Sequence, residues 1–381
     1  MTDPEGAGGG PGPTNSLVDV TGLLVGQHTA IGDGFCTGTT VVLAPDGGMT
    51  AGVDVRGGGP ATHETDLLAP TASVERIHAL VLTGGSAYGL AACTGVMNDL
   101  ADRGIGLQVG ERPGEVVPLV PGAALFDLGR GGDFRARPTA DFGAAAVSAA
   151  RAVGPLAGRS TGVVLGNVGA GMGAVTSNLK GGVGTASIVL DGKGDGGVTV
   201  AALVVVNAAG SPIDPRSGEL LGARLLVPAD GPAPPVPGTS ARRELLEVTA
   251  RRPPGITFAA GSTAGPSDPA IPGVIGNTTL VVVATDAALT KAQCSKLAAV
   301  AQNGMARALN PVHTMVDGDV VFGLSTGTAG VPDPIGFHGI TVAGADVVTR
   351  AIVRALLAAV TTTTPAGTWP SWTDVATGSV R

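Results

Sequence analysis

The residues best placed to do chemistry are Asn277 and Thr278, in the stretch GNTTLVVVATD. A loop rich in Gly, Pro and Ser precedes them, and the apolar run after them predicts a buried strand. Cleavage between them would give Thr278 both a hydroxyl and a free α-amine. Because that amine has a reference pKa of about 7.7–8.0, it can act as general base for the hydroxyl. The alternative interpretation is an ordinary turn before a strand.

Three further polar sites lie in stretches that are otherwise glycine-rich or apolar. Lys180 is the one cation of GNVGAGMGAVTSNLKGGVGTAS, and Asn207 follows the apolar run VTVAALVVV. Asp317 and Asp319 flank a glycine just before the run VVFGL. Each also has a simpler interpretation, as a glycine-rich turn, a strand-end cap or a solvated turn. Taken singly, none of them identifies a site.

Alternating strand and helix patterns predict the scaffold that must position these residues. Strands are predicted to begin near residues 39, 51, 187, 198, 277 and 319. Several of them are apolar without alternation, as expected of strands buried on both faces. Helices are predicted within 78–104 (with Ser86 as N-cap) and over 140–153, 240–251, 289–309 and 345–360. This order of elements favours an α/β or mixed α+β fold with layered sheets and helices.

The chain of 381 residues is long enough for one large domain or two ordinary ones. Residues 1–15 have no basic or apolar segment and predict a flexible tail rather than a signal peptide. We expect a single domain over 16–365, with an irregular surface excursion at 211–276, and a C-terminal tail at 366–381.

Composition excludes several classes of protein. The net charge is −7, no Lys/Arg-rich run is present, and aromatic residues make up 3% of the chain, which disfavours nucleic-acid binding. No apolar run reaches the ~18 residues of a membrane span. Three widely spaced cysteines predict buried thiols rather than disulfides or a zinc site. We therefore expect a soluble, cytoplasmic protein with no metal.

The chain resembles the N-terminal-nucleophile hydrolases that include the L-aminopeptidase/D-esterases, the β-aminopeptidases and the nylon-oligomer hydrolase. The resemblance covers about residues 17–360. The motifs that carry it are GTTVVL, AGVDVRGG, LTGGSAYGL, NVGAGMGA, KGGVGTAS and GNTTLVVVATDA. It implies a four-layer α/β/β/α sandwich, made as one precursor that cleaves itself into an α chain (1–277) and a β chain (278–381). Members commonly assemble as tetramers of such αβ units.

The resemblance also assigns residues. It implies that Thr278 is the nucleophile and that the side-chain amide of Asn207 helps to form the oxyanion hole. Lys180 matches the catalytic lysine of the nylon-hydrolase branch, and Asp317 and Asp319 match its acidic pair. The aminopeptidase branch has Ser and Glu at those two positions.

One departure from the family pattern concerns a tyrosine that several members place near the nucleophile. Here ALFDLG offers Phe126, which lacks the hydroxyl. Whatever contact that tyrosine supplies must come from another group in this chain.

The function implied is amide hydrolysis without a cofactor, on short peptides or small amides, as in an aminopeptidase. Three alternatives stay open at this point. LTGGSAYG resembles a nucleophile elbow at Ser86, although Tyr88 replaces its second glycine and neither His313 nor His338 is an obvious partner. The others are acyl transfer, as in the ornithine acetyltransferases, and a non-catalytic metabolite-binding protein.

Overall fold

The computed structural model describes residues 9–152, 162–191, 197–250 and 276–379. The strands are β1 Gly9–Gly10, β2 Leu24–Gly32, β3 Phe35–Leu43, β4 Thr50–Val55, β5 Ala61–His63, β6 Ala79–Thr83, β7 Leu107–Gln108, β8 Val116–Val117, β9 Gly122–Ala124, β10 Val175–Thr176, β11 Leu179–Lys180, β12 Val183–Leu190, β13 Val198–Val205, β14 Leu280–Thr285, β15 Val320–Ser325, β16 Thr362–Thr364 and β17 Gly367–Trp369. The helices are α1 Ser86–Gly89, α2 Ala91–Asp102, α3 Ala140–Ala152, α4 Thr239–Ala250, α5 Lys291–Ala308, α6 Pro334–Ala358 and α7 Trp372–Thr377.

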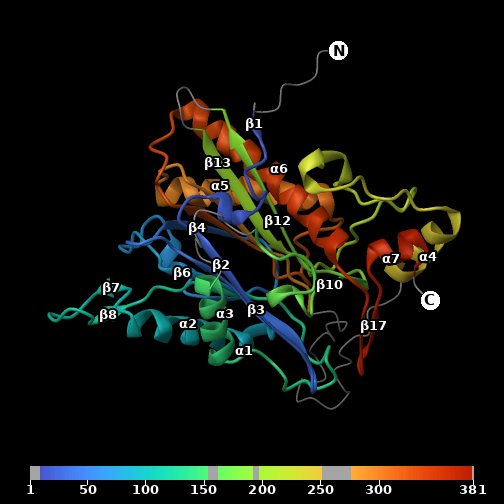
Figure 1. Cartoon of the computed structure of the whole chain (residues 1–381), viewed down its shortest axis with the longest axis horizontal. Helices are drawn as coiled ribbons and strands as arrows, with labels where there is room; N and C mark the ends of the chain where they lie inside the picture. The colour runs from blue at the N-terminus through green and yellow to red at the C-terminus, as the bar shows by residue number, and fades with distance from the viewer. Residues whose placement is uncertain (1–8, 153–161, 192–196, 251–275, 380–381) are drawn as a thin grey trace, which may run out of the picture.

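Two mixed sheets form the centre of the fold. The larger has the strand order β1-β12-β13-β14-β15-β4, and the smaller has the order β2-β3-β6-β9-β5. Helices α5 and α6 pack on the larger sheet, whereas α2 and α3 pack on the smaller one. Figure 1 shows these two helix pairs on opposite sides of the sheets.

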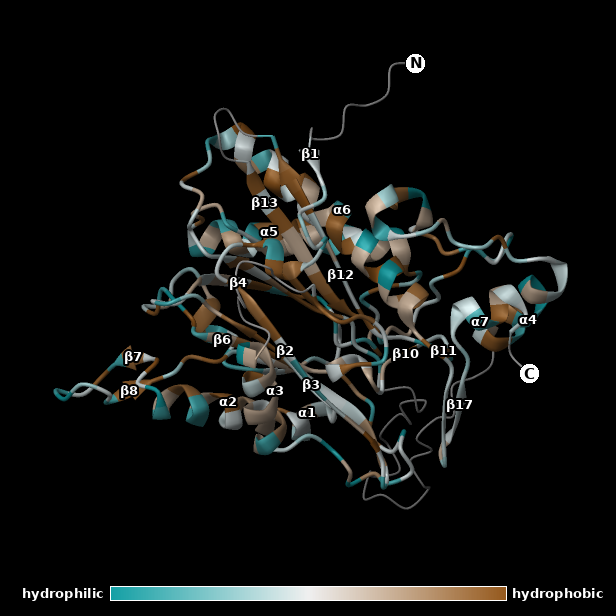
Figure 2. Ribbon diagram, viewed as in Figure 1, coloured by the Kyte–Doolittle hydropathy of each residue, from teal (hydrophilic) through white to brown (hydrophobic). Residues whose placement is uncertain are grey.

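Three apolar clusters account for this arrangement. One lies between the larger sheet and α5–α6, a second joins residues of both sheets, and a third lies between the smaller sheet and α2–α3. All six residues of β14 are buried, which explains why its sequence is apolar without alternation. Figure 2 shows the same apolar character along β13.

The register of three adjacent strands brings the candidate residues into one row. In the antiparallel pair β13–β14, Val205 lies opposite Leu280, so two residues beyond the strand ends Asn207 lies opposite Thr278. In the parallel pair β14–β15, Leu280 lies opposite Val320. The same step back from that pair places Gly318 beside Thr278. The sheet therefore collects Asn207, Thr278 and Gly318 at the same ends of three neighbouring strands.

Local signals explain the helices that follow. Thr290 accepts a hydrogen bond from the Gln293 amide and begins α5 with a capping box. Asp333 caps α6 and Pro334 is its first residue, so this helix starts well before the predicted residue 345. The other predicted helices and strands are present with shifted ends. Ser86 is the first residue of α1, with Gly85 as its N-cap.

Both expected tails pack on the domain where the structure describes them. Trp372 in α7 is fully buried, and its indole nitrogen donates to the carbonyl of Gly218. Leu245 of α4 is buried in the same cluster, so the 211–250 excursion contributes to the core. Near the other end, β1 pairs with β12. Leu245 and Trp372 anchor two of these segments through apolar contacts, whereas residues 9–15 are held by the pairing of β1 with β12 and by polar contacts of Asn15.

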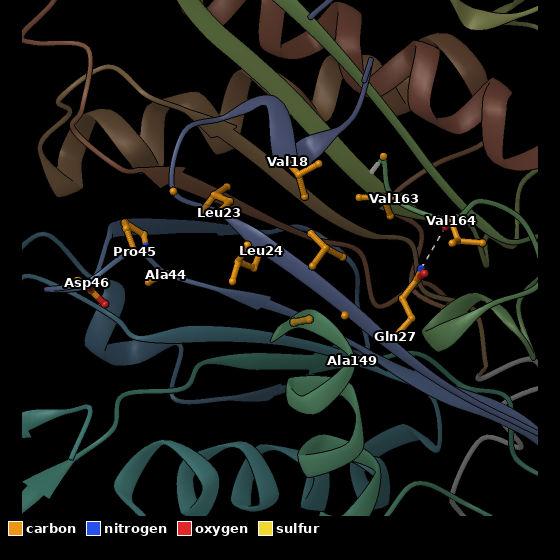
Figure 3. A pocket seen from close by; sticks show the side chains of 15 residues that line it. Val18, Leu23, Leu24, Gln27, Ala44, Pro45, Asp46, Ala149, Val163 and Val164 are labelled. Atoms are coloured by element: carbon orange, nitrogen blue, oxygen red, sulfur yellow. Dashed lines mark hydrogen bonds between the residues drawn. The ribbon is translucent and has the colours of Figure 1, made fainter. Parts of the chain in front are cut away.

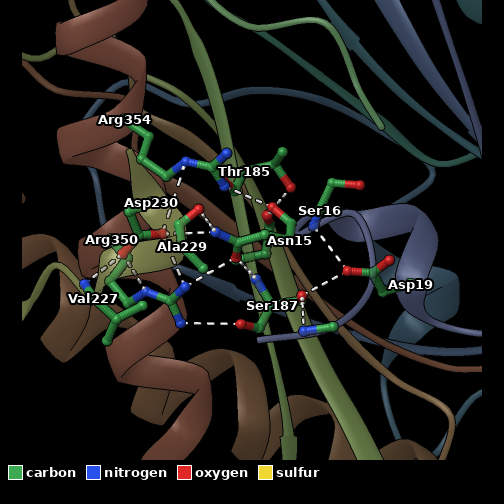
Figure 4. A network of polar contacts seen from close by, with 12 residues as sticks. Asn15, Ser16, Asp19, Thr185, Ser187, Val227, Ala229, Asp230, Arg350 and Arg354 are labelled. Carbon is green, nitrogen blue, oxygen red and sulfur yellow. Dashed lines mark hydrogen bonds and ion pairs between the residues drawn. The ribbon is translucent and has the colours of Figure 1, made fainter. Parts of the chain in front are cut away.

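A buried polar network anchors the N-terminal segment to α6 (Figure 4). Arg350 pairs with Asp230 at 2.8 Å and also donates to the Asn15 side chain at 2.9 Å. Arg354 donates to the Asn15 and Thr185 carbonyl oxygens. Burial alone would raise the pKa of Asp230, but hydrogen bonds from Arg350, a backbone amide and Asn15 hold it below its usual value. Charged groups this deeply buried need such pairing.

Candidate active site

The Asn277–Thr278 peptide bond lies at the entrance to β14, and Thr278 is only 4% exposed. The Thr278 amide donates to the Asn207 carbonyl at 2.6 Å. Its hydroxyl donates to the Asn277 carbonyl oxygen, also at 2.6 Å. A carbonyl bond is about 1.23 Å long, so the Asn277 carbonyl carbon lies at most about 3.8 Å from that hydroxyl oxygen. This approaches the separation of about 3–3.5 Å from which attack proceeds.

A second donor meets the same carbonyl oxygen. The Gly318 amide lies 2.8 Å from the Asn277 oxygen. A Cβ atom at position 318 would lie 2.5 Å from the Thr278 hydroxyl oxygen and 2.8 Å from the Gly59 carbonyl oxygen. Glycine is therefore the residue that lets this amide and the Thr278 hydroxyl share one carbonyl.

The Asn207 side chain is fully buried and its orientation is fixed. Its Oδ1 accepts from the Arg130 guanidinium at 2.6 Å and from the Val175 amide at 3.0 Å. The opposite end, Nδ2, donates to the Gly276 carbonyl at 3.5 Å. Because two donors hold Oδ1, the side-chain N–H groups face the segment that precedes Thr278.

Asp317 and Asp319 hold the loop that carries Gly318. Each carboxylate accepts three hydrogen bonds of 2.6–3.0 Å. The donors to Asp317 are the Ala209 amide, the Thr314 amide and the Thr314 hydroxyl, and those to Asp319 are the Thr279 amide, the His313 amide and His313 Nδ1. Within the described residues, neither carboxylate contacts Lys180.

Lys180 lies in the glycine-rich segment before β12. Its ammonium donates to the carbonyl oxygens of Gly171, Ala174 and Gly181 at 2.8–3.0 Å, and burial lowers its pKa to about 7. These three acceptors use all three N–H donors of a lysine ammonium. In the parts of the chain that the structure describes, no hydrogen bond joins Lys180 to Thr278. In this state its contacts fix the loop that presents the Val175 amide.

Arg130 and Asp127 were not among the predicted site residues. The Asp127 side chain is buried and Arg130 is partly buried; burial lowers the pKa of Arg130 and raises that of Asp127 to about 6. Arg130 donates to the Gly173 carbonyl as well as to Asn207, and Asp127 accepts from the Gly85 amide at 2.7 Å. Both residues follow Phe126 in ALFDLGRGG, where a charged pair among apolar and glycine residues was the available signal.

Phe126 itself lies against the scissile segment. A Cβ atom on Gly276 would be 3.0 Å from its ring, so the ring packs on the residue before Asn277.

The nucleophile elbow at Ser86 and a phosphate site in the glycine-rich turn find less support. The structure gives Ser86 no hydrogen bond to a histidine within the described residues. The Gly169 and Ala170 amides of the glycine-rich turn donate to the hydroxyls of Thr29 and Thr40, so they are not available to bind a phosphate group.

A separate pocket of about 530 Å³ runs along the edge strand β2 (Figure 3). It is lined by residues of β2, the 44–46 turn, the end of α3 and residues 162–164. None of the residues around Thr278 lines it.

Comparison with family models identifies the family of this chain. The model of peptidase family S58 matches residues 15–369. The chain belongs to this family. An uncharacterized aminopeptidase of Mycobacterium leprae is 43% identical over 366 residues, 91% of each chain. A 6-aminohexanoate-oligomer endohydrolase of Paenarthrobacter ureafaciens is 28% identical, over 78% of this chain and 71% of its own length.

Solved structures show the fold of this S58 member. A Burkholderia β-aminopeptidase has a TM-score of 0.68 at 21% identity, covering 98% of this chain and 96% of its own. The L-aminopeptidase D-Ala-esterase/amidase of Ochrobactrum anthropi, described as a variant of the Ntn hydrolase fold, has a TM-score of 0.67 at 20% identity. That match covers 96% of this chain and 92% of the other. The resemblance found in the sequence is thus confirmed at the level of family and fold.

In the described residues, no helix is both long and apolar enough to cross a membrane.

Proposed function

We propose that this S58 peptidase is a self-processing amide hydrolase whose nucleophile is Thr278. The observation that carries the proposal is the convergence of two donors, the Thr278 hydroxyl at 2.6 Å and the Gly318 amide at 2.8 Å, on the carbonyl oxygen of Asn277. The hydroxyl is beside the carbon it would attack. The Gly318 amide is placed where negative charge would develop, as a fixed oxyanion donor.

Self-cleavage then follows from ordinary acyl-transfer chemistry. The Thr278 oxygen bonds to the Asn277 carbonyl carbon, the C–N bond breaks, and the hydroxyl proton ends on the released Thr278 amine. Water hydrolyses the resulting ester, which leaves a carboxylate on Asn277 and restores the hydroxyl. The four-layer α/β/β/α arrangement, supported by the three apolar clusters, keeps β13, β14 and β15 paired around the cut.

In the mature protein the Thr278 amine is the general base for its own hydroxyl. The Asn207 carbonyl, already bonded to that nitrogen, orients it. The Asn207 side-chain amide is the oxyanion donor for an incoming substrate. Asp317 and Asp319 serve by fixing the Gly318 loop, and Lys180 by fixing the glycine-rich loop. The mechanism needs no metal or organic cofactor.

For the substrate we propose short peptides or small amides, cleaved as by an aminopeptidase. The family and the names of the similar chains support this class. The test is release of p-nitroaniline from aminoacyl-p-nitroanilides by the cut wild type, with Thr278→Ala as the control. Turnover that depends on Thr278 supports the proposal. Equal rates in the wild type and Thr278→Ala would reject Thr278 as the nucleophile.

A further inference from the structure

Two donors near Thr278 face different carbonyl groups in the uncut chain. The Gly318 amide bonds to the Asn277 oxygen, which belongs to the scissile bond. The Asn207 Nδ2 bonds to the Gly276 oxygen, one residue earlier. While the chain is intact, the Asn207 side-chain amide therefore faces the Gly276 carbonyl, at 3.5 Å, and not the carbonyl of the scissile bond. Departure of the new chain end would leave this amide free.

On the basis of the proposed function, we propose that Arg130 is the positioning residue that aims the Asn207 amide at substrate. We further propose that it has no part in self-cleavage. The site then contains two oxyanion donors that act in succession. Gly318 stabilises the charge on Asn277 during the cut, and Asn207, held by Arg130, stabilises the charge on each later substrate.

The contacts of Asn207 support this role for a guanidinium. An asparagine amide that rotated by half a turn would point its NH2 group at the Arg130 and Val175 donors, and burial makes such an unpaired arrangement costly. The Arg130 contact is charge-assisted and short, at 2.6 Å. It also draws electron density toward Oδ1, which strengthens Nδ2 as a donor.

The surroundings of Arg130 keep its guanidinium in place. A second acceptor, the Gly173 carbonyl, is bonded to the same nitrogen. The buried Asp127 lies close enough to favour the charged form of Arg130. The Arg130 carbonyl accepts from the Thr364 hydroxyl at 2.6 Å, so the backbone is fixed as well.

The experiment compares the rate of self-cleavage with the rate of turnover in Arg130→Met. We expect self-cleavage within about 2-fold of wild type, and a kcat reduced about 10- to 100-fold with KM changed little, since loss of an oxyanion donor costs about 10²–10³ in kcat. Lys291→Met is the matched control. Its buried ammonium also donates to three carbonyls but lies on α5. Turnover by cut Lys291→Met should stay near wild type.

Arg130→Lys and a double mutant guard against a folding defect. Lysine keeps the charge opposite Asp127 but not the fixed planar fork, so we expect an intermediate loss in kcat with normal self-cleavage. If Arg130 acts through Asn207, then Arg130→Met combined with Asn207→Ala should be no slower than Asn207→Ala alone.

Three outcomes would overturn the inference. An unimpaired kcat in cut Arg130→Met, with an active wild type, would overturn this inference alone. Equal slowing of self-cleavage and turnover in both Arg130 variants would assign Arg130 a general structural role instead. A wild type that is uncut or inactive would overturn the proposed function, and this inference with it.

Discussion

The amide nitrogen of Gly318 lies 2.8 Å from the carbonyl oxygen of Asn277. The two residues lie just before β15 and β14, which are neighbouring parallel strands. The flanking carboxylates of Asp317 and Asp319 each accept three hydrogen bonds, from donors of their own loop and of the neighbouring strand ends. Asp317 and Asp319 therefore hold the loop in the position that directs the Gly318 amide to the Asn277 carbonyl oxygen.

Replacing Gly318 by alanine tests this contact. The added Cβ would lie 2.5 Å from the Thr278 hydroxyl oxygen, so either the hydroxyl or the loop must move. Because a displacement of about 1 Å can cost about 100-fold in rate, we expect self-cleavage to slow by that factor or more. The half-time on denaturing gels measures it. Gly10→Ala, where a Cβ meets nothing within 4 Å, should cut at the wild-type rate.

Thr278 and Thr279 are adjacent hydroxyl residues with opposite expected behaviour. The Thr279 hydroxyl is buried and has no hydrogen-bond partner within the described residues. Thr279→Val should therefore cut normally and be as stable as wild type or more stable by about 1 kcal/mol, since an unpaired buried hydroxyl is removed. Thr278→Val should not cut at all. Cleavage lost in Thr279→Val and kept in Thr278→Val would reverse the assignment of the nucleophile.

Sequence patterns predicted the strands and helices because buried apolar runs and helical spacing are local. They also placed Asn207, Asp317, Asp319 and Thr278 at strand ends. The row they form depends on the register of β13, β14 and β15. Register is a property of paired strands, so no single strand sequence contains it.

The contacts of Lys180 and Arg130 also could not be predicted from local sequence. The resemblance assigns Lys180 a catalytic role, but the three carbonyl contacts of its ammonium depend on the path of the glycine-rich loop, which composition does not specify. Arg130 contacts Asn207 across a separation of 77 residues. The packing of the C-terminal segment was not predicted either, although Trp369, Trp372 and Val375, all buried, are an apolar signal in this stretch.

Asp127 gives a pH-dependent stability prediction. Burial raises its pKa to about 6 from an ordinary value of 3.8, so the folded state binds this proton more tightly than the unfolded chain does. Its contribution to stability is present at low pH and is lost as pH rises from about 4 through 6. With about 1.36 kcal/mol per pKa unit, Asp127→Asn should gain about 2–3 kcal/mol on the unsubstituted protein between pH 4 and 7.5. Urea unfolding in the uncut Thr278→Ala background measures it, and a pH-independent difference would contradict it.

The buried pair of Arg350 and Asp230 joins segments on either side of the proposed cleavage site (Figure 4). In the Thr278→Ala background, Arg350→Met should cost up to about 3–5 kcal/mol in urea unfolding at pH 7, because it leaves the buried Asp230 with only the longer ion pair to Arg354, at 3.8 Å. The pKa of Asp230 is held low, so this difference should shrink as pH falls below about 4.

The matched control for that pair is Arg307→Met. Its exposed pair with Asp346 should contribute less than about 1 kcal/mol. Equal losses of stability in Arg350→Met and Arg307→Met would show that the buried Arg350 pair contributes no more to stability than the exposed pair.

The central claim is that Thr278 attacks the Asn277 carbonyl and frees its own amine. The most direct test is the denatured intact mass of freshly purified wild type and of Thr278→Ala. We predict two chains in the wild type, corresponding to residues 1–277 and 278–381, and one full-length chain in Thr278→Ala. A wild type that stays a single chain for days at neutral pH, or a Thr278→Ala protein that is cut, would contradict it.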